Sequence, residues 1–81
     1  MPRHHPLKRR VGVNVLEGFG FKLDRVKGDH AQYEHESFRG RRRVVTVPFY
    51  DEFSPQGEVL KGIFRQSGIR KKEFYKAAAR L

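Results

Sequence analysis

The sequence predicts a small α+β domain: a three-stranded antiparallel sheet with helices on one face, followed by a short C-terminal helix. Two observations carry this prediction. Residues 21–48 hold three segments with the alternation or the β-branched residues typical of strands, separated by tight-turn signals. Residues 9–20 and 55–67, which flank them, carry apolar residues at helical spacing. With 81 residues in all, the chain is expected to form one domain, spanning residues 9–81.

The N-terminal segment, residues 1–8, contains two prolines and no apolar periodicity. We expect a flexible basic arm there. The first helix is expected over residues 9–20, because Val11, Val15 and Phe19 recur at every fourth position and so share one helix face.

The first two strands are expected over residues 21–27 and 30–37. Between them stands Gly28–Asp29, a dipeptide typical of tight turns that require a positive φ. Side chains alternate between the two faces of a strand, and His30 shares its face with polar residues. His30 should therefore face solvent or a ligand, and His35 should lie on the opposite face.

The third strand is expected over residues 41–48, after a turn at residues 38–40. Three valines favour a strand there, and Pro48 ends the run. Residues 49–54 should form a loop that carries three aromatic side chains.

The second helix should begin at Ser54 and Pro55, because a capping residue followed by proline is typical of a helix start. Its apolar stripe runs through residues 55–67, and Gly68 is expected to end it. A last helix is expected over residues 70–80, with its basic side chains turned outward.

The composition favours a nucleic-acid partner. Lys and Arg number 18 against 9 Asp and Glu, which gives a net charge of +9. Solubility, or attraction to an acidic protein, is the alternative explanation. Cysteine is absent, which excludes a disulfide framework and a thiolate zinc site. No apolar run is long enough to cross a bilayer and no signal peptide is evident, so we expect a cytoplasmic protein without membrane contact.

His30 is the candidate catalytic residue, because imidazole can both accept and give a proton near neutral pH. A surface histidine without any role is the alternative. The adjacent His4 and His5 would make only a weak metal site, and His30 lacks further convincing ligands, so no metal is expected. A chain this short cannot line a deep pocket and also keep a core, so no cofactor is expected either.

The candidate RNA-binding residues are basic or aromatic side chains around this histidine. Arg25, Lys27, Arg41 and Arg43 can contact phosphates. For Arg41 and Arg43, a solvated strand end that resists edge aggregation is an equal alternative. Tyr50 can stack on a base, whereas its loop neighbours are expected to cover the core. Tyr33 and Tyr50 are also candidates for proton donation beside the histidine.

The order helix–strand–strand–strand–helix, taken with several short motifs, resembles the HicA toxins of bacterial toxin–antitoxin pairs. Five pieces occur in the same order as in that family, and each of them alone is short. They are Gly20–Phe21, Arg25, Gly28 with His30, Arg43–Pro48 and Leu60–Ile69.

The resemblance implies a fold like that of double-stranded-RNA-binding domains. It also implies an mRNA-cleaving toxin that works through one histidine without metal, and a HicB-type antitoxin that covers the site. Carried over by position, His30 takes the catalytic role and Gly28 forms the turn before it. Asp29 replaces the usual serine of the family, and Tyr50 stands near the place of a frequent histidine. An inactive RNA-binding module of the same fold and a protein-interaction subunit that binds the antitoxin therefore stay open as alternatives.

Overall fold

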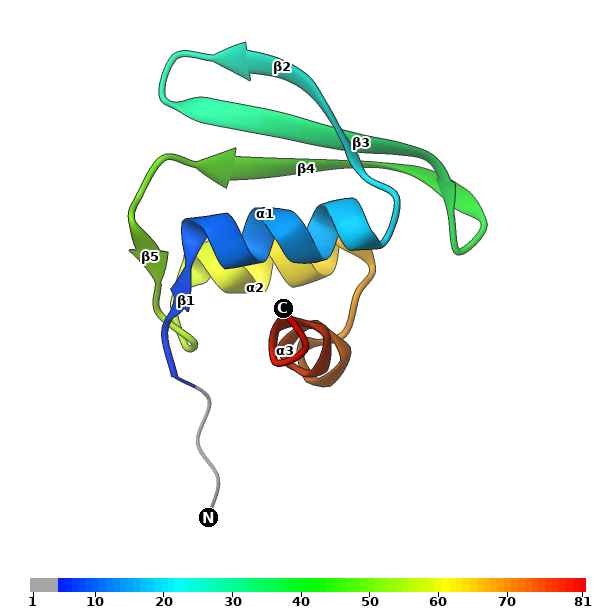
Figure 1. The fold of residues 1–81 in the computed structure, drawn as a ribbon. Helices are drawn as coiled ribbons and strands as arrows, with labels where there is room; N and C mark the ends of the chain where they lie inside the picture. The colour runs from blue at the N-terminus through cyan, green and yellow to red at the C-terminus, as the bar shows by residue number, and fades with distance from the viewer. Residues whose placement is uncertain (1–4) are drawn as a thin grey trace.

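A computed structural model describes residues 5–81 of the chain. It contains three helices and a three-stranded antiparallel sheet within a compact α+β fold, as the sequence predicts (Figure 1). The elements are, in chain order, β1 (Leu7–Lys8), α1 (Arg9–Gly18), β2 (Lys22–Lys27), β3 (His30–Phe38), β4 (Arg41–Pro48), β5 (Glu52–Phe53), α2 (Glu58–Ser67) and α3 (Lys71–Ala78).

The main sheet has the order β2–β3–β4, with both pairs antiparallel. Figure 1 shows α1 and α2 on one side of this sheet and α3 beyond them, and β2 is the strand farthest from the helices. All six residues of β2 are exposed, so this strand forms an open edge of the sheet. Among residues 5–81, no helix is long and apolar enough to cross a bilayer.

The core lies between the sheet and the helices and is apolar. Ala31 and Tyr33 of β3 are buried there while His30 is exposed, so the predicted alternation of faces along this strand is confirmed. The other buried apolar residues come from every layer of the fold: Leu7, Val15, Leu16, Phe21, Val45, Val47, Phe53, Leu60, Ile63, Ile69, Phe74 and Tyr75.

A second, two-stranded sheet differs from the prediction. Leu7 and Lys8, expected in a flexible arm, form β1, and Glu52 and Phe53, expected in a loop, form β5. The two strands pair antiparallel, with Leu7 opposite Phe53. Both of these side chains are buried in the core. Their burial holds the end of the N-terminal segment and the end of the loop after β4 in place. The remainder of the predicted arm, residues 1–4, lies outside the described residues.

The start of α2 also differs from the prediction. The helix begins at Glu58 and not at Pro55, with Gly57 as its capping residue. Ser54 forms a turn, because its carbonyl accepts a hydrogen bond from the Gly57 amide at 3.0 Å. The serine–proline pair therefore closes a turn that leads out of β5, which is the other structure this dipeptide favours. The predicted end at Gly68 is confirmed, with a left-handed φ of 76°.

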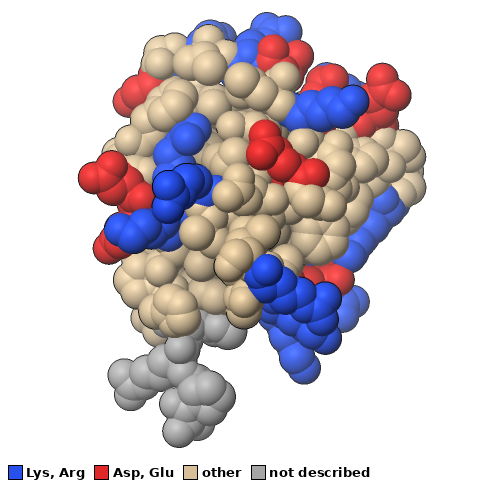
Figure 2. Space-filling model, viewed as in Figure 1, with Lys and Arg blue, Asp and Glu red and all other residues tan. Residues whose placement is uncertain are grey.

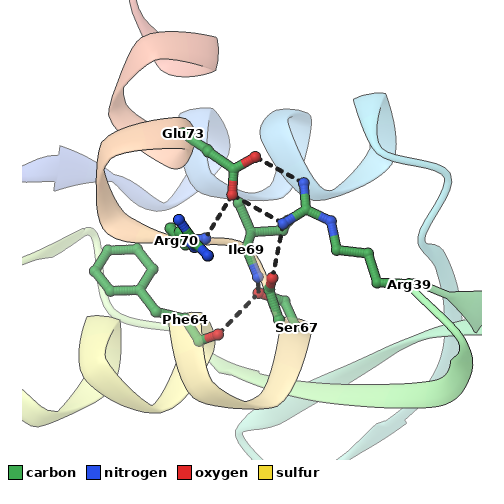
Figure 3. Close-up of polar contacts among 7 residues, drawn as sticks. Arg39, Phe64, Ser67, Ile69, Arg70 and Glu73 are labelled. Atoms are coloured by element: carbon green, nitrogen blue, oxygen red, sulfur yellow. Dashed lines mark hydrogen bonds and ion pairs between the residues drawn. The ribbon is translucent and has the colours of Figure 1, made fainter.

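A polar cluster joins the β3–β4 turn to the start of α3 (Figure 3). Both terminal nitrogens of Arg39 donate to the Glu73 carboxylate, at 2.9 and 2.7 Å. Arg39 also donates to the Gly68 carbonyl at 3.1 Å, and the Arg70 amide donates to Glu73 at 3.1 Å. This bidentate arrangement fixes α3 against the hairpin. It lowers the pKa of Glu73 from 4.5 to about 2, chiefly through Arg39 and next through the Arg70 amide.

This cluster is expected to make stability depend on pH at the acid end. Since the pKa of Glu73 is lower in the folded protein, the ionised carboxylate stabilises the fold above pH 4.5, and this contribution is lost as the pH falls toward 2. Glu73→Gln should lower the melting temperature at neutral pH and flatten its decline between about pH 5 and pH 2. Thermal unfolding at several pH values measures both effects. The control is Glu36→Gln, an exposed change on β3, whose melting temperature should fall with pH as that of the wild type does. If the melting temperatures of all three proteins fall with the same slope, the prediction is contradicted.

Candidate nucleic-acid interface

His30 is the first residue of the central strand, β3. Lys27 of β2 lies opposite it on one side and Pro48 of β4 on the other. Residues that face each other across an antiparallel pair project to the same side of the sheet, so Lys27 and His30 share the face that the helices leave open. The His30 side chain is 47% exposed, so its imidazole is accessible to a large substrate.

The turn before His30 brings a carboxylate close to the imidazole. Gly28 has a φ of 62°, which confirms the positive φ that the dipeptide predicts. Asp29 follows, and its Oδ1 lies 2.7 Å from His30 Nδ1, within ion-pair distance. When Nδ1–H donates to this carboxylate, the Nε2 atom carries the lone pair. The geometry therefore presents Nε2 as the atom that can exchange a proton with a ligand.

Three segments that are distant in the sequence meet beside His30. The Phe49 amide donates to the Asp29 carbonyl at 3.2 Å, which ties the end of β4 to the β2–β3 turn. The Arg9 amide donates to the Asp51 carbonyl at 2.9 Å, and Arg9 Nε donates to the Pro48 carbonyl at 3.0 Å. Figure 1 shows the β2–β3 turn, the end of β4 and the start of α1 along one edge of the molecule, at the left.

A surface groove lies along this edge, between the start of α1 and the loop that leads from β4 to β5. We call it the α1–β5 groove. Its lining residues are Lys8, Arg9, Arg10, Val13, Asn14, Phe49, Tyr50 and Asp51. Figure 2 shows Lys and Arg side chains gathered over this edge, with acidic side chains beside them.

Two of the predicted RNA-binding cations lie on the same face as His30. Lys27 is its direct neighbour, and Arg25 lies opposite Gln32, one step further along the same face. Arg25 Nε is 3.1 Å from the Asp24 carboxylate, and the arginine side chain is 67% exposed. Arg25 is therefore accessible to a ligand that extends from His30 across β2.

The other two predicted cations, Arg41 and Arg43, are not brought near His30. Arg43 pairs with His35, five residues along β3 from His30 and so about 16 Å away. Its Nε donates to the Phe38 carbonyl at 3.1 Å, and its guanidinium covers Gly68, where an added Cβ would lie 2.6 Å from Nη1. Arg43 thus packs at the end of α2, and the exposed Arg41 lies further still from the histidine.

The two tyrosine candidates differ in their exposure to solvent. Tyr50 is 60% exposed and lines the α1–β5 groove, whereas Tyr33 is only 6% exposed and lies in the core. Tyr33 is therefore not available for proton donation beside His30. His35 stacks against Phe21 and Phe38 with ring centroids 5.3 Å apart in both pairs. Across residues 5–81, no three His, Asp or Glu side chains are grouped so that they could hold a metal ion.

Sequence reasoning missed the basic side chains of Lys8, Arg9 and Arg10 as part of this edge. The basic run is visible in the sequence, but nothing local relates it to the aromatic pair Phe49–Tyr50. The link depends on contacts between distant segments. The Arg9 guanidinium carbon lies 4.2 Å from the centre of the Phe49 ring, a cation–π distance.

The fold and this edge define a small, basic α+β domain that presents an ordered, accessible histidine beside a cationic and aromatic groove. A family model described as HicA toxin of bacterial toxin-antitoxin matches residues 13–69, which is most of the chain. The chain therefore belongs to the HicA toxin family and is a toxin of a toxin–antitoxin system. This membership implies that it pairs with an antitoxin. No curated protein matches the chain.

Proposed function

We propose that this toxin is an endoribonuclease that cleaves mRNA without a metal ion, and that His30 is its catalytic residue. The observation that carries the proposal is the imidazole itself: it is accessible, its Nδ1 lies 2.7 Å from the Asp29 carboxylate, and Lys27 lies directly opposite it on β2. Membership of a toxin family supports the same role, because cutting mRNA stops protein synthesis.

The proposed chemistry is attack by a ribose 2′-oxygen on the adjacent phosphorus. A base removes the 2′-hydroxyl proton, the bond from phosphorus to the 5′-oxygen breaks, and an acid gives that oxygen a proton. The products are a 2′,3′-cyclic phosphate and a 5′-hydroxyl. His30 Nε2 serves as the base or as the acid, and a single imidazole cannot do both in one step. Tyr50 or a water molecule supplies the second proton transfer.

The cations near His30 have a separate task in this chemistry. The phosphorane that forms during attack carries additional negative charge, and a nearby cation stabilises it. Lys27, directly opposite His30, is the proposed partner, and Arg25 holds the RNA further along β2. Gly28 contributes through the turn that positions Asp29 and His30. Arg41 and Arg43 lie too far along β4 to contact the same phosphate.

The proposed partners are mRNA and a HicB-like antitoxin that covers the site, and the proposed compartment is the cytoplasm, where mRNA is translated. An excess of Lys and Arg around His30 would suit an acidic antitoxin surface as well as RNA. Addition of the antitoxin should therefore inhibit cleavage in proportion to the complex formed.

The test is incubation of the purified protein with a long single-stranded RNA in the presence of EDTA. We expect cleavage at a rate that added magnesium does not raise. Tight, salt-dependent RNA binding without cleavage would overturn the proposal and indicate an inactive binding module. Absence of RNA affinity, together with tight binding to the antitoxin, would overturn it in favour of a protein-interaction subunit.

A further inference from the structure

We propose that the α1–β5 groove is a binding subsite for single-stranded RNA, and that it holds the nucleotide next to the phosphate cleaved at His30. The inference rests on the proposed function and deepens it, because it names the form of RNA that is bound and the surface that binds it. Three of the groove residues, Lys8, Arg9 and Arg10, lie outside the part of the chain that the family model matches.

The two walls of the groove suit the two parts of a nucleotide. The end of β1 and the start of α1 supply three cations, and Asp51 supplies the single carboxylate of the lining, so the groove attracts phosphate. The opposite wall carries Phe49 and Tyr50, which are 47% and 60% exposed. Exposed aromatic rings stack on the faces of unpaired bases. A duplex keeps those faces covered by neighbouring bases, so the groove favours a single strand.

Arg9 is already held in place for such a ligand. Its amide and its Nε are hydrogen-bonded to the carbonyls of Asp51 and Pro48, and its guanidinium lies over the Phe49 ring. The amide hydrogen bond fixes the backbone, and the other two contacts fix the plane of the guanidinium before any RNA arrives. A side chain that is fixed in advance loses little conformational entropy on binding, which strengthens a phosphate contact.

The groove lies at the same end of the sheet as His30. Pro48 lies directly opposite His30, and the next residue, Phe49, donates its amide to the Asp29 carbonyl. Tyr50 follows within about 7 Å along the backbone from Pro48. In the proposed complex, one RNA strand stacks a base on Tyr50 and passes the end of β4, which places the adjoining phosphate at His30. An acidic segment of the antitoxin would also suit the cations, but it would leave the exposed aromatic wall without a matching ligand.

The test measures RNA binding without cleavage, in protein that carries His30→Ala. The probes are a short single-stranded RNA and a duplex of the same sequence, followed by fluorescence anisotropy at several salt concentrations. Added to His30→Ala, Tyr50→Leu should weaken single-strand binding about fivefold or more, and Tyr50→Phe should preserve it. Lys8→Gln combined with Arg10→Gln, both exposed positions, should reduce the salt slope by about 1.4.

The matched control removes two charges elsewhere. Lys72→Gln combined with Lys76→Gln removes the same net charge at exposed positions of α3, a helix that contributes no residue to the groove lining. Single-strand affinity equal in the groove and control variants would overturn the proposal, as would loss of antitoxin binding with unchanged RNA affinity. If the wild type fails to cleave RNA but the groove variants still lose single-strand affinity, the subsite stands and the proposed catalytic function fails.

Discussion

Replacement of His30 by alanine is expected to slow RNA cleavage by about 10²–10⁴-fold, the usual contribution of a general acid or base. In the proposed mechanism Nε2 of this imidazole exchanges a proton with the RNA, and alanine leaves nothing in its place that can do so. Because the His30 side chain is about half exposed, the change removes little packing, and the fold should be preserved. Single-turnover cleavage of a defined RNA, at saturating protein, measures the chemical step.

The matched control is His5→Ala, which removes an exposed histidine from the segment that precedes β1. It should cleave at the wild-type rate, since the site uses nothing of the His5 imidazole. If His30→Ala retains wild-type cleavage with an unchanged circular dichroism spectrum, the catalytic role of His30 is contradicted. A fall of equal size in both variants would indicate a general loss of folded protein.

Replacement of Phe53 by alanine is expected to cost about 3–5 kcal/mol of the free energy of unfolding. The Phe53 ring is 1% exposed and lies against Gly12 of α1. It is also the residue through which β5 pairs with Leu7 of β1. For a domain this small, with a total stability of about 5–15 kcal/mol, the loss is a large share of the whole. Urea unfolding followed by circular dichroism measures it.

The control for Phe53 is Phe49→Ala, four residues earlier in the same segment. Phe49 is exposed and contacts Arg9 through its ring face, so its loss should cost about 1 kcal/mol or less. Equal destabilisation by the two changes would contradict the assignment of Phe53 to the core. RNA cleavage by Phe53→Ala should also fall, because β5 supports the loop that carries Tyr50 beside the groove.

The parts of the fold that local patterns determine could be predicted from the sequence. The alternation along β3, with its turn at Gly28–Asp29, correctly placed His30 outward. Tyr33, proposed as a proton donor beside it, is buried instead. The two-residue strands β1 and β5 could not be predicted, since each is too short to show a period and exists only through its partner. The start of α2 was misplaced, because Ser54–Pro55 suits a turn as well as a helix start.

The candidate site could be predicted only in part. Gly28 and His30 stood out as a short local motif, and the resemblance to a toxin family gave the histidine a role. Arg43 was chosen for its charge, but the register of β3 and β4 places it opposite His35 and not near His30. The α1–β5 groove escaped notice because its basic and aromatic walls are about forty residues apart in the sequence, and only tertiary contacts join them.

The most direct test of the central claim, that His30 drives metal-independent attack by a 2′-oxygen, is the identity of the RNA ends at one mapped cleavage position. The substrate is a single-stranded RNA, compared with a copy that carries a 2′-deoxy sugar at that position, both with EDTA present. The mechanism predicts a 2′,3′-cyclic phosphate and a 5′-hydroxyl from the RNA, and no cleavage of the deoxy copy. Cleavage of the deoxy copy, or 5′-phosphate ends, would contradict it.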